Sequence, residues 1–426
     1  MDSVNGVSRK VKQGVAAILA ALVALAAGGC REAGPAPEPT PSPAPALAVA
    51  EASPTAKPTP QALTNAEKTR QEGEAVVAGL LEKNVTYKPL RDPEGAYTLK
   101  GVKNIHMIGM VTGEYSENRT ASRYGVGGTD LGVTVNRGEE TFLFFGDTFR
   151  YEDQTGNWRS NVAAVTRDSD YTDGITFDRM IVTGTGVAKE LLRGKKAEGK
   201  EVTKIPTGAV CIDGNLYLSF MSVRHWGEPG AWDCNYGAVA KSTDGGENWE
   251  ILEGLAWPGE SRFCQMYPVL VEDMVYVPGI GGGRNGGAAL MRAPAGRYEE
   301  FDAYEYLTGY GEDGTPVFTQ GEEGLEKAID FLPKPVGEMS FLYSEYLGEW
   351  LVTYISGQDI ILRSAKEIWG PYSKPVTIAA QQDFPGLYGA FMNPRYVSED
   401  GKKIGFFMSL WLPVYNVALM EMELEK

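Results

Sequence analysis

Histidine and cysteine are scarce in this sequence of 426 residues, which has two histidines and four cysteines. The histidines, His106 and His225, stand in no recognisable motif, and no two cysteines have the Cys-x-x-Cys spacing. A structural zinc site needs about four such ligands, and a Ser-His-Asp triad needs a histidine as its base. The scarcity therefore argues against both kinds of site.

Clusters of basic residues are also lacking, apart from the short run RGKK (193–196). Proteins that bind nucleic acid neutralise phosphates with clustered lysine and arginine, whereas this chain has a net charge of −16. The glycine-rich stretch 279–287 lacks the Lys-Ser/Thr pair of a phosphate-binding loop, so we interpret it as a loop that allows close backbone approach. We predict no nucleic-acid partner, no cofactor and no metal ion, and we expect a monomer.

One strongly apolar run is present, close to the N-terminus. Basic residues at positions 9, 10 and 12 precede thirteen apolar residues (Val15–Ala27), and Gly28-Gly29-Cys30 follows. This order is typical of a secretory signal, and the run is too short to span a bilayer. A cysteine in this place resembles the lipoprotein signal, in which the thiol is acylated. We predict a lipoprotein-type signal over 1–30 with Cys30 as the lipid anchor; ordinary secretion is the alternative.

Two further parts follow the predicted signal. Residues 31–89 begin with a stretch rich in proline and alanine that should be extended, as in a spacer, and a short helix is predicted over Ala66–Leu81. Residues 90–426 are enough for one large domain. If Cys30 is lipidated, at most one disulfide can form among the other cysteines: Cys211, Cys234 and Cys264.

The domain is predicted to be all-β. Short apolar or alternating runs are bounded by glycine, aspartate, asparagine and proline throughout it. The segment 339–379 divides into four strands in series, and similar units start at Thr129, Gly208, Met266 and Ala390. Five such units, of about 40 to 50 residues each, predict a five-bladed β-propeller, with a strand around Ile105 closing the ring. A two-sheet sandwich is the alternative.

The octapeptide STDGGENW (242–249) supports the propeller independently. It resembles the Asp-box of sialidase-like propellers, a hairpin turn beneath which the tryptophan packs. Its role is structural, at the outer edge of a blade, so we assign Asp244 no chemistry.

Three acidic residues adjoin apolar strands and are the predicted catalytic residues. Asp130 precedes LGVTV, Asp147 follows FLFFG, and Glu338 precedes MSFLYS. The starts of inner propeller strands converge at one mouth of the channel, and burying an unpaired carboxylate there costs several kcal/mol. Paired carboxylates cleave glycosidic bonds. Turn capping is the alternative role for either aspartate.

Polar donors and aromatic rings at predicted strand ends and loops fit the recognition of a sugar, which needs rings for stacking and fixed hydrogen-bond donors. Each such residue is more often found in packing or in a surface ion pair. The predicted substrate-binding residues are Arg159, Asn161, Arg224, Trp226, Arg284, Arg395 and Trp411.

At these residues the chain resembles a bacterial family catalogued as a domain of unknown function, whose characterised members are endo-D-arabinanases. The similarity extends from about Gly101 to the C-terminus, and its motifs are GGTDLGVTV, FLFFGDTF, WRSN and SLWLPVYNV, in that order. The resemblance implies a five-bladed propeller and places the catalytic pair on Asp130 and Asp147. Glu338 is proposed from its position alone.

Together these observations predict a surface-anchored glycoside hydrolase that cleaves D-arabinan or a related polysaccharide. We expect it on the outer face of the cell membrane, or secreted. A glycan-binding propeller without catalysis is one alternative, and a propeller that binds other proteins is another.

Overall fold

The computed structural model describes residues 65–411 and 414–426. The predicted signal, Cys30 and the proline-rich spacer lie outside these residues. The chain divides into Met1–Gln61 and a compact unit, Ala62–Lys426, which begins before the boundary at residue 90 expected from the sequence. Within the described ranges, no helix has the length and apolar character needed to cross a membrane.

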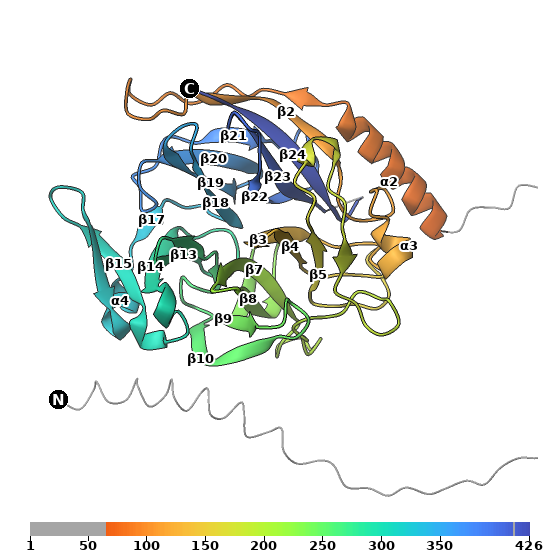
Figure 1. Ribbon diagram of the computed structural model, residues 1–426, viewed down its shortest axis with the longest axis horizontal. Helices are drawn as coiled ribbons and strands as arrows, with labels where there is room; N and C mark the ends of the chain where they lie inside the picture. The colour runs from red at the N-terminus through yellow and green to blue at the C-terminus, as the bar shows by residue number, and fades with distance from the viewer. Residues whose placement is uncertain (1–64, 412–413) are drawn as a thin grey trace, which may run out of the picture. The chain divides into compact units, whose positions relative to one another are not determined.

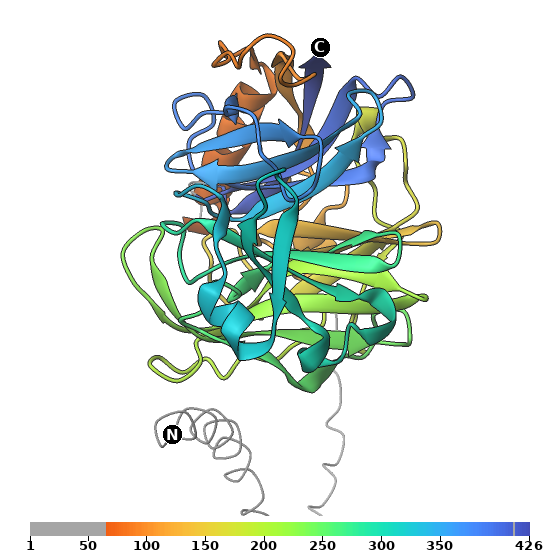
Figure 2. The ribbon, with the colours of Figure 1, turned by 90° about the vertical axis from the view of Figure 1, so that its left-hand side faces the viewer.

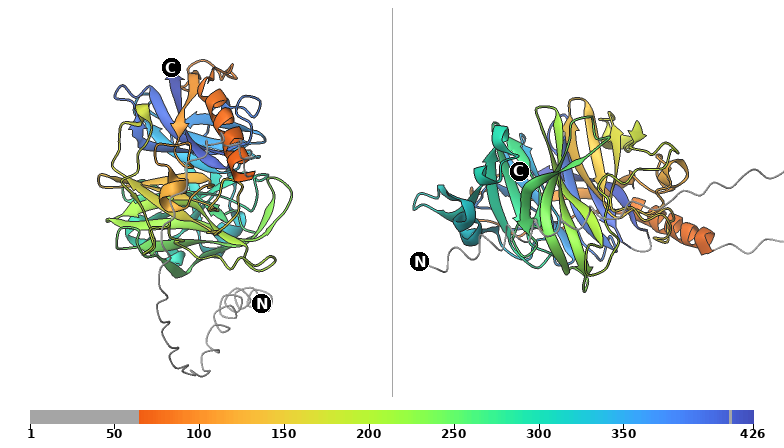
Figure 3. Two further views of the ribbon diagram at one scale, coloured as in Figure 1. Left: turned by 90° about the vertical axis from the view of Figure 1, so that its right-hand side faces the viewer. Right: turned by 90° about the horizontal axis from the view of Figure 1, so that it is seen from below.

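The segment before residue 90 belongs to this unit because it packs on it. Helix α2 (Asn65–Leu81) lies along strand β2 (Gly101–Met110), and its Val77 and Leu80 are buried (Figure 3). Strand β1 (Asn84–Val85) pairs with β2. The apolar end of the helix therefore docks on the domain.

The fold is all-β, with a β-propeller arrangement of antiparallel sheets that follow one another round the molecule (Figure 1). The described strands form five sheets. The first comprises β3 (Leu131–Arg137), β4 (Glu140–Phe145), β5 (Val162–Thr166) and β6 (Arg179–Met180). The second comprises β7 (Thr203–Ile212), β8 (Asn215–Trp226), β9 (Trp232–Ser242) and β10 (Glu250–Pro258).

The third sheet is the most elaborate, and Figure 2 shows it facing the viewer, with α4 (Gly321–Lys327) at its outer part. It comprises β11 (Gln265–Met266), β12 (Val269–Val271), β13 (Met274–Ile280), β14 (Ala288–Pro294), β15 (Glu305–Tyr310), β16 (Pro316–Gln320) and β17 (Asp330–Leu332). The fourth comprises β18 (Met339–Ser344), β19 (Glu349–Ser356), β20 (Asp359–Ala365) and β21 (Val376–Ala379). The remaining helical elements are α3 (Thr120–Tyr124) and the 3-10 turns Tyr171–Asp173, Ala295–Arg297 and Phe301–Ala303.

The fifth sheet joins distant parts of the chain. Strands β22 (Leu387–Val397), β23 (Lys403–Leu410) and β24 (Asn416–Glu425) are completed by β2, which pairs with β24 from Gly101 opposite Glu425 to Met110 opposite Ala418. The strand predicted around Ile105 thus connects the beginning of the domain to its end.

Packing between sheets explains the continuous apolar runs. Phe142, Leu143, Phe144 and Phe145 of β4 are all fully buried, because residues on both faces of this strand pack against other parts of the core. The ring of Trp249 lies edge-on to Phe144, with 5.5 Å between centroids. The predicted Asp-box is therefore a structural turn that packs on the neighbouring sheet. Three cysteines are free thiols: Cys211, Cys234 and Cys264.

Candidate active site

Strand pairing brings Asp130 and Asp147 to the same end of the first sheet. Asp130 directly precedes β3, Asp147 comes two residues after β4, and the two strands pair with Leu131 opposite Phe145. The backbone N–H of Gly146 donates to the carbonyl oxygen of Asp130 at 3.1 Å. Two acids that are 17 positions apart in the sequence thus lie on adjacent turns.

The backbone next to Asp130 is unusual. Leu131 has a φ of 71° and a β-bulge interrupts the pairing between Leu131 and Val133. A left-handed leucine costs on the order of 1–3 kcal/mol and persists only where the surroundings impose it, often at functional sites, and bulges redirect side chains next to such sites. A Cβ atom on Gly146 would lie 2.3 Å from Oδ1 of Asp130, so only glycine fits beside this carboxyl.

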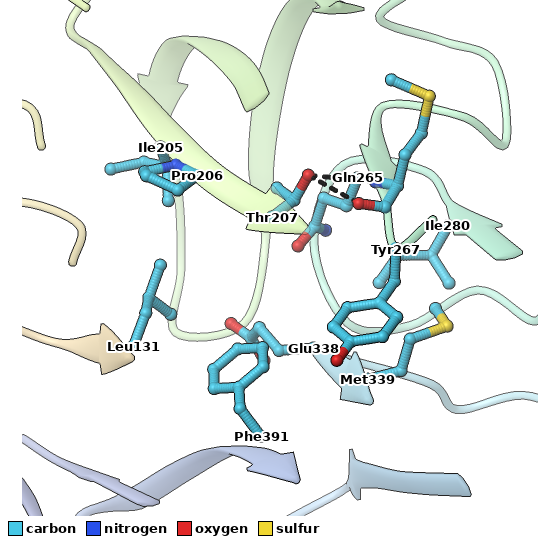
Figure 4. A pocket seen from close by; sticks show the side chains of 11 residues that line it. Leu131, Ile205, Pro206, Thr207, Gln265, Tyr267, Ile280, Glu338, Met339 and Phe391 are labelled. Atoms are coloured by element: carbon cyan, nitrogen blue, oxygen red, sulfur yellow. Dashed lines mark hydrogen bonds between the residues drawn. The ribbon is translucent and has the colours of Figure 1, made fainter. Parts of the chain in front are cut away.

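A cavity lies where strands β3, β7, β11, β13, β18 and β22, drawn from all five sheets, converge (Figure 4). Glu338, which directly precedes β18, projects among its lining side chains, and Leu131 adjoins Asp130. The lining residues are Leu131, Ile205, Pro206, Thr207, Gln265, Met266, Tyr267, Ile280, Glu338, Met339 and Phe391. The three predicted acids therefore flank one convergence point, since each stands at the cavity end of its strand.

Asp130 is held in a poorly solvated environment. Its Oδ2 accepts a hydrogen bond from the Tyr388 hydroxyl at 2.7 Å, and its Oδ1 is buried without a partner among the described residues. The pKa of Asp130 is raised to about 7, chiefly by burial and also by the negative charges of Asp147 and Glu338, while the hydroxyl groups of Tyr388 and Tyr415 oppose the increase. A carboxyl with this pKa carries its proton over much of the neutral range.

Asp147 has more support for its charge. Its Oδ1 accepts hydrogen bonds from the indole of Trp158 at 2.7 Å and the hydroxyl of Thr203 at 2.6 Å. The pKa of Asp147 is raised to about 6, because the effect of burial exceeds the opposing effects of these two donors and of the Lys196 ammonium. The ionised form of Asp147 is therefore better stabilised than that of Asp130, because two donors and a cation surround it.

Glu338 is paired. Nε of Arg284 donates to its two carboxylate oxygens at 3.1 and 2.9 Å, and Nη2 donates to Oε1 at 2.7 Å. Its side chain is 12% exposed. Burial lowers the pKa of Arg284, but Glu338 more than offsets this and the net change is upward. The pair places the Arg284 guanidinium beside Tyr388, 5.1 Å from the ring centroid.

The sequence matches the family model described as Domain of unknown function (DUF4185) over residues 115–421. The chain belongs to this family. The match spans Asp130, Asp147, Glu338 and the residues that contact them. No curated protein matches the sequence.

Solved structures of other proteins are similar to this DUF4185 protein. A presumed hydrolase from Bacteroides ovatus is similar with a TM-score of 0.53 and 12% identity, covering 79% of this chain and 97% of the other. An exo-beta-1,3-galactanase from Phanerochaete chrysosporium has a TM-score of 0.44 and 11% identity, covering 70% and 59%. A GH43_1 enzyme from Xanthomonas citri has a TM-score of 0.44 and 11% identity, covering 70% and 87%. At 12% identity, the similarity to the Bacteroides ovatus protein establishes the fold alone.

Of the residues predicted to bind substrate, Arg284 stands in the site of the DUF4185 domain, and two others are buried in structural roles. Arg159 is 4% exposed and donates to the carbonyl oxygens of Asn157, Ala188 and Gly125. The amide of Asn161 bonds four backbone groups, at Leu191, Leu192 and Lys204. Both therefore hold loops in place and present nothing to a ligand.

The other predicted binding residues lie at different ends of the domain. Arg395 bonds the β3–β4 turn at Gly138 and Glu139, the opposite end of β3 from Asp130. Arg224 and Trp226 lie at the exposed end of β8. Trp411 is 52% exposed and edge-on to Tyr415, whose hydroxyl donates to the carbonyl oxygen of Asp147 at 3.1 Å.

Tyr388, Thr203 and Lys196 were missed by sequence reasoning. Thr203 is the first residue of β7, and Tyr388 is the second residue of β22. Asp130 and Glu338 also adjoin the first residues of strands. Polar residues at the start of an apolar strand are therefore a signal that applies to hydroxyl groups as well as to carboxyl groups. Lys196 stands in a loop, and no pattern indicated it. Among the described residues no cluster of three or more His, Cys, Asp or Glu side chains could hold a metal ion.

Proposed function

We propose that this protein is a glycoside hydrolase of the endo-D-arabinanase type, with the five sheets as the five blades of its propeller. The observation that carries the proposal is the contrast between two neighbouring half-buried aspartates. Asp130, with a pKa of about 7, has one donor, and Asp147, with a pKa of about 6, has two donors and a nearby cation. Cleavage of a glycosidic bond needs one protonated and one ionised carboxyl group.

The environments assign the roles. Asp130 acts as general acid and gives its proton to the glycosidic oxygen as the bond to the anomeric carbon breaks. Asp147 acts on the anomeric carbon as nucleophile, or on water as base. Tyr388, whose pKa is raised well above its usual value by burial and by Asp130, stays a phenol. Its hydrogen bond stabilises the Asp130 carboxylate that proton transfer creates, because it donates to the charged oxygen.

Glu338 and Arg284 act as a fixed ion pair. Glu338 accepts three charge-assisted hydrogen bonds from Arg284, so its carboxylate oxygens are occupied in holding the guanidinium in place. Arg284 in turn offers Nη1, which has no partner among the described residues, to a substrate hydroxyl.

The substrate and the location belong to the same proposal. The motifs shared with endo-D-arabinanases favour a furanosidic polymer, D-arabinan or a relative. The signal predicted over residues 1–30, with Cys30 as its lipid anchor, favours export and attachment to a membrane, and such a protein meets polysaccharide outside the cell.

Polymer cleavage tests this function directly. The purified protein is incubated with mycobacterial arabinogalactan and a panel of plant and bacterial polysaccharides, and released oligosaccharides are measured. We expect release of D-arabinan fragments, and a loss of at least about 100-fold in Asp130→Asn and in Asp147→Asn. Asp173→Asn is the matched control, since Asp173 is exposed and its side chain has no hydrogen bond or ion pair within the described part. Undiminished cleavage by both site variants would refute the assignment, and binding of a polymer without cleavage would favour the glycan-binding alternative.

A further inference from the structure

Two tryptophans on the β8–β9 hairpin take no part in the chemistry proposed above. Trp226 ends β8 and Trp232 begins β9, and their rings meet edge to face with centroids 5.5 Å apart and an interplanar angle of 68°. Trp226 is 39% exposed, whereas Trp232 is partly buried and donates from its indole to Sδ of Met221 at 3.2 Å. The hairpin thus presents one open indole supported by a second, anchored indole.

This hairpin lies at the end of the second sheet that faces Asp147. Thr203, which bonds Asp147, is opposite Val223 in the β7–β8 pairing, and Trp226 continues β8 three residues beyond it. Trp226 therefore stands beyond the strand end at which Asp147 is bound.

Contacts connect the hairpin to Asp130 in an unbroken row. Arg284 lies 5.5 Å from the centroid of the Trp232 ring on one side and 5.1 Å from that of Tyr388 on the other. Tyr388 bonds Asp130 at 2.7 Å. The row runs from Asp130 through Tyr388 and Arg284 to the two edge-to-face indoles of Trp232 and Trp226, so it combines polar groups with aromatic rings.

The glycine-rich stretch 279–287 fixes the hairpin against Arg284. The backbone N–H of Arg284 donates to the carbonyl oxygen of Gly230 at the hairpin tip, at 2.9 Å. A Cβ atom on Gly282 would lie 2.5 Å from the carbonyl oxygen of Trp232, and one on Gly283 would lie 2.8 Å from that of Gly230. Side chains here would push the hairpin away, so the glycines maintain the row.

A row of this kind suits a chain of sugars. The C–H face of a sugar ring packs on an aromatic plate by apolar contact, while its hydroxyl groups remain free to bond a guanidinium or water. A single sugar bound at the acids does not reach the exposed ring of Trp226. Only a longer chain of sugars contacts the acids and this ring at the same time.

We propose that Trp226, supported by Trp232, forms a distal carbohydrate subsite that binds a residue of the polymer several sugars away from the bond that is cleaved. The inference rests on the proposed function and deepens it. The added element is that the site holds an extended chain, of which one residue lies on Trp226.

Kinetics on long and short substrates test the subsite. Trp226→Ala is compared with Trp226→Tyr, which keeps a ring, on D-arabinan and on the shortest D-arabinan oligosaccharide that the wild type cleaves. We expect Trp226→Ala to lose roughly tenfold in kcat/KM on the polymer, through KM, to lose less than twofold on the short substrate, and Trp226→Tyr to recover most of the loss. Tyr343→Ala is the matched control, since Tyr343 is 41% exposed and lies at the end of β18 away from Glu338.

Binding without catalysis separates this inference from the proposed function. Affinity electrophoresis in gels containing D-arabinan, or another polymer of the panel, compares Asp147→Asn with Asp147→Asn/Trp226→Ala. Retardation that the second change abolishes supports the subsite, even if no polymer is cleaved and the hydrolase proposal fails. If Trp226→Ala changes neither cleavage nor retardation, the subsite is refuted and the hydrolase proposal is unaffected. Absence of cleavage and of retardation by any polymer overturns both.

Discussion

The hydroxyl oxygens of Thr129 and Thr148 lie 2.7 Å apart in a hydrogen bond, and each threonine is the chain neighbour of one of the two aspartates. Thr148 also donates to the carbonyl oxygen of Gly146 at 2.8 Å, so Thr129 is the donor of the shared bond. Both threonines are fully buried. The two turns that carry Asp130 and Asp147 are therefore joined to each other by side chains as well as by backbone.

Thr148→Val should loosen this connection. Valine has the shape of threonine but leaves a buried hydroxyl and a carbonyl oxygen without partners, which costs about 1–3 kcal/mol, and we expect kcat to fall more than KM changes. Urea unfolding and steady-state kinetics measure the two effects. Thr185→Val is the control, because it removes an exposed hydroxyl pair, that of Thr183 and Thr185. Equal losses in the two variants would contradict the connection.

The pH dependence of kcat/KM should be a narrow bell. Asp147 must be ionised and its pKa is about 6, so activity falls below that pH; Asp130 must be protonated and its pKa is about 7, so activity falls above it. The maximum should lie at about pH 6.5, with limbs that belong to the coupled pair. Initial rates at low substrate concentration, taken from about pH 4 to about pH 9, measure the pH dependence of kcat/KM. A flat profile across this range would exclude these two groups as the acid and the base.

Lys196 should set the position of the acid limb. Its ammonium lies 4.2 Å from the centroid of the Trp158 ring, whose indole bonds Asp147, and its charge lowers the pKa of Asp147. In Lys196→Met the acid limb should move to higher pH, by about half a unit to one unit, as expected for loss of one nearby cation. The alkaline limb should stay in place. Lys88→Met, at an exposed lysine, should reproduce the wild-type profile, and an unmoved acid limb in Lys196→Met would show that its charge does not act on Asp147.

Asp130→Asn should make the protein more stable at neutral pH. The pKa of Asp130 is raised in the folded state, so the native protein holds this proton more tightly than the unfolded chain does. Stability contributed by the group is present below about pH 4 and is lost as pH rises to about 7. Asparagine carries no such penalty, so the gain should grow from little at pH 4 to on the order of 4 kcal/mol at pH 7. Thermal melts of both proteins over this range measure it, and a constant difference would show that the carboxyl group is not desolvated.

Arg284 and Glu338 should be strongly coupled. Removing either partner leaves a largely buried charge alone and should cost about 3–5 kcal/mol, whereas removing both should cost less than the sum. Urea unfolding of Arg284→Met, Glu338→Gln and the double variant gives the coupling, which we expect to exceed about 1.5 kcal/mol. The exposed pair of Arg297 and Glu300 is the control cycle, with an expected coupling much weaker than that of the buried pair, because solvent screens its charges. Additive losses at Arg284 and Glu338 would contradict a buried pair.

The strands were predictable because their signals are local. The segments MSFLYS, EWLVTYIS and DIILRSA coincide with β18, β19 and β20, since turn residues mark both ends of each. The third sheet was harder: α4 and the hairpin β15–β16 lie in a stretch without a clear period. Periodicity reports burial of a face, and much of β16 is exposed or only partly buried.

The acids were predictable and most of their partners were not, for a physical reason. A carboxyl group at the end of an apolar strand is visible in the sequence, whereas its solvation depends on residues that the ring brings in from elsewhere. Arg159 looked like an exposed donor, but carbonyl oxygens 29 and 34 positions away bind it. Whether a polar side chain faces a ligand or a loop is decided by such long-range contacts.

The pairing of β2 with β24 has a consequence for how the protein is made. Asp130 and Tyr388 are 258 positions apart, and the ring that unites them closes only when the last strand meets one of the first. Contacts between residues so far apart in the sequence form slowly, because the chain loses entropy on closing before these contacts contribute favourable free energy. A nascent chain therefore carries both aspartates long before it carries a site. A chain that ends before Asn416 leaves β2 without the strand that closes the ring.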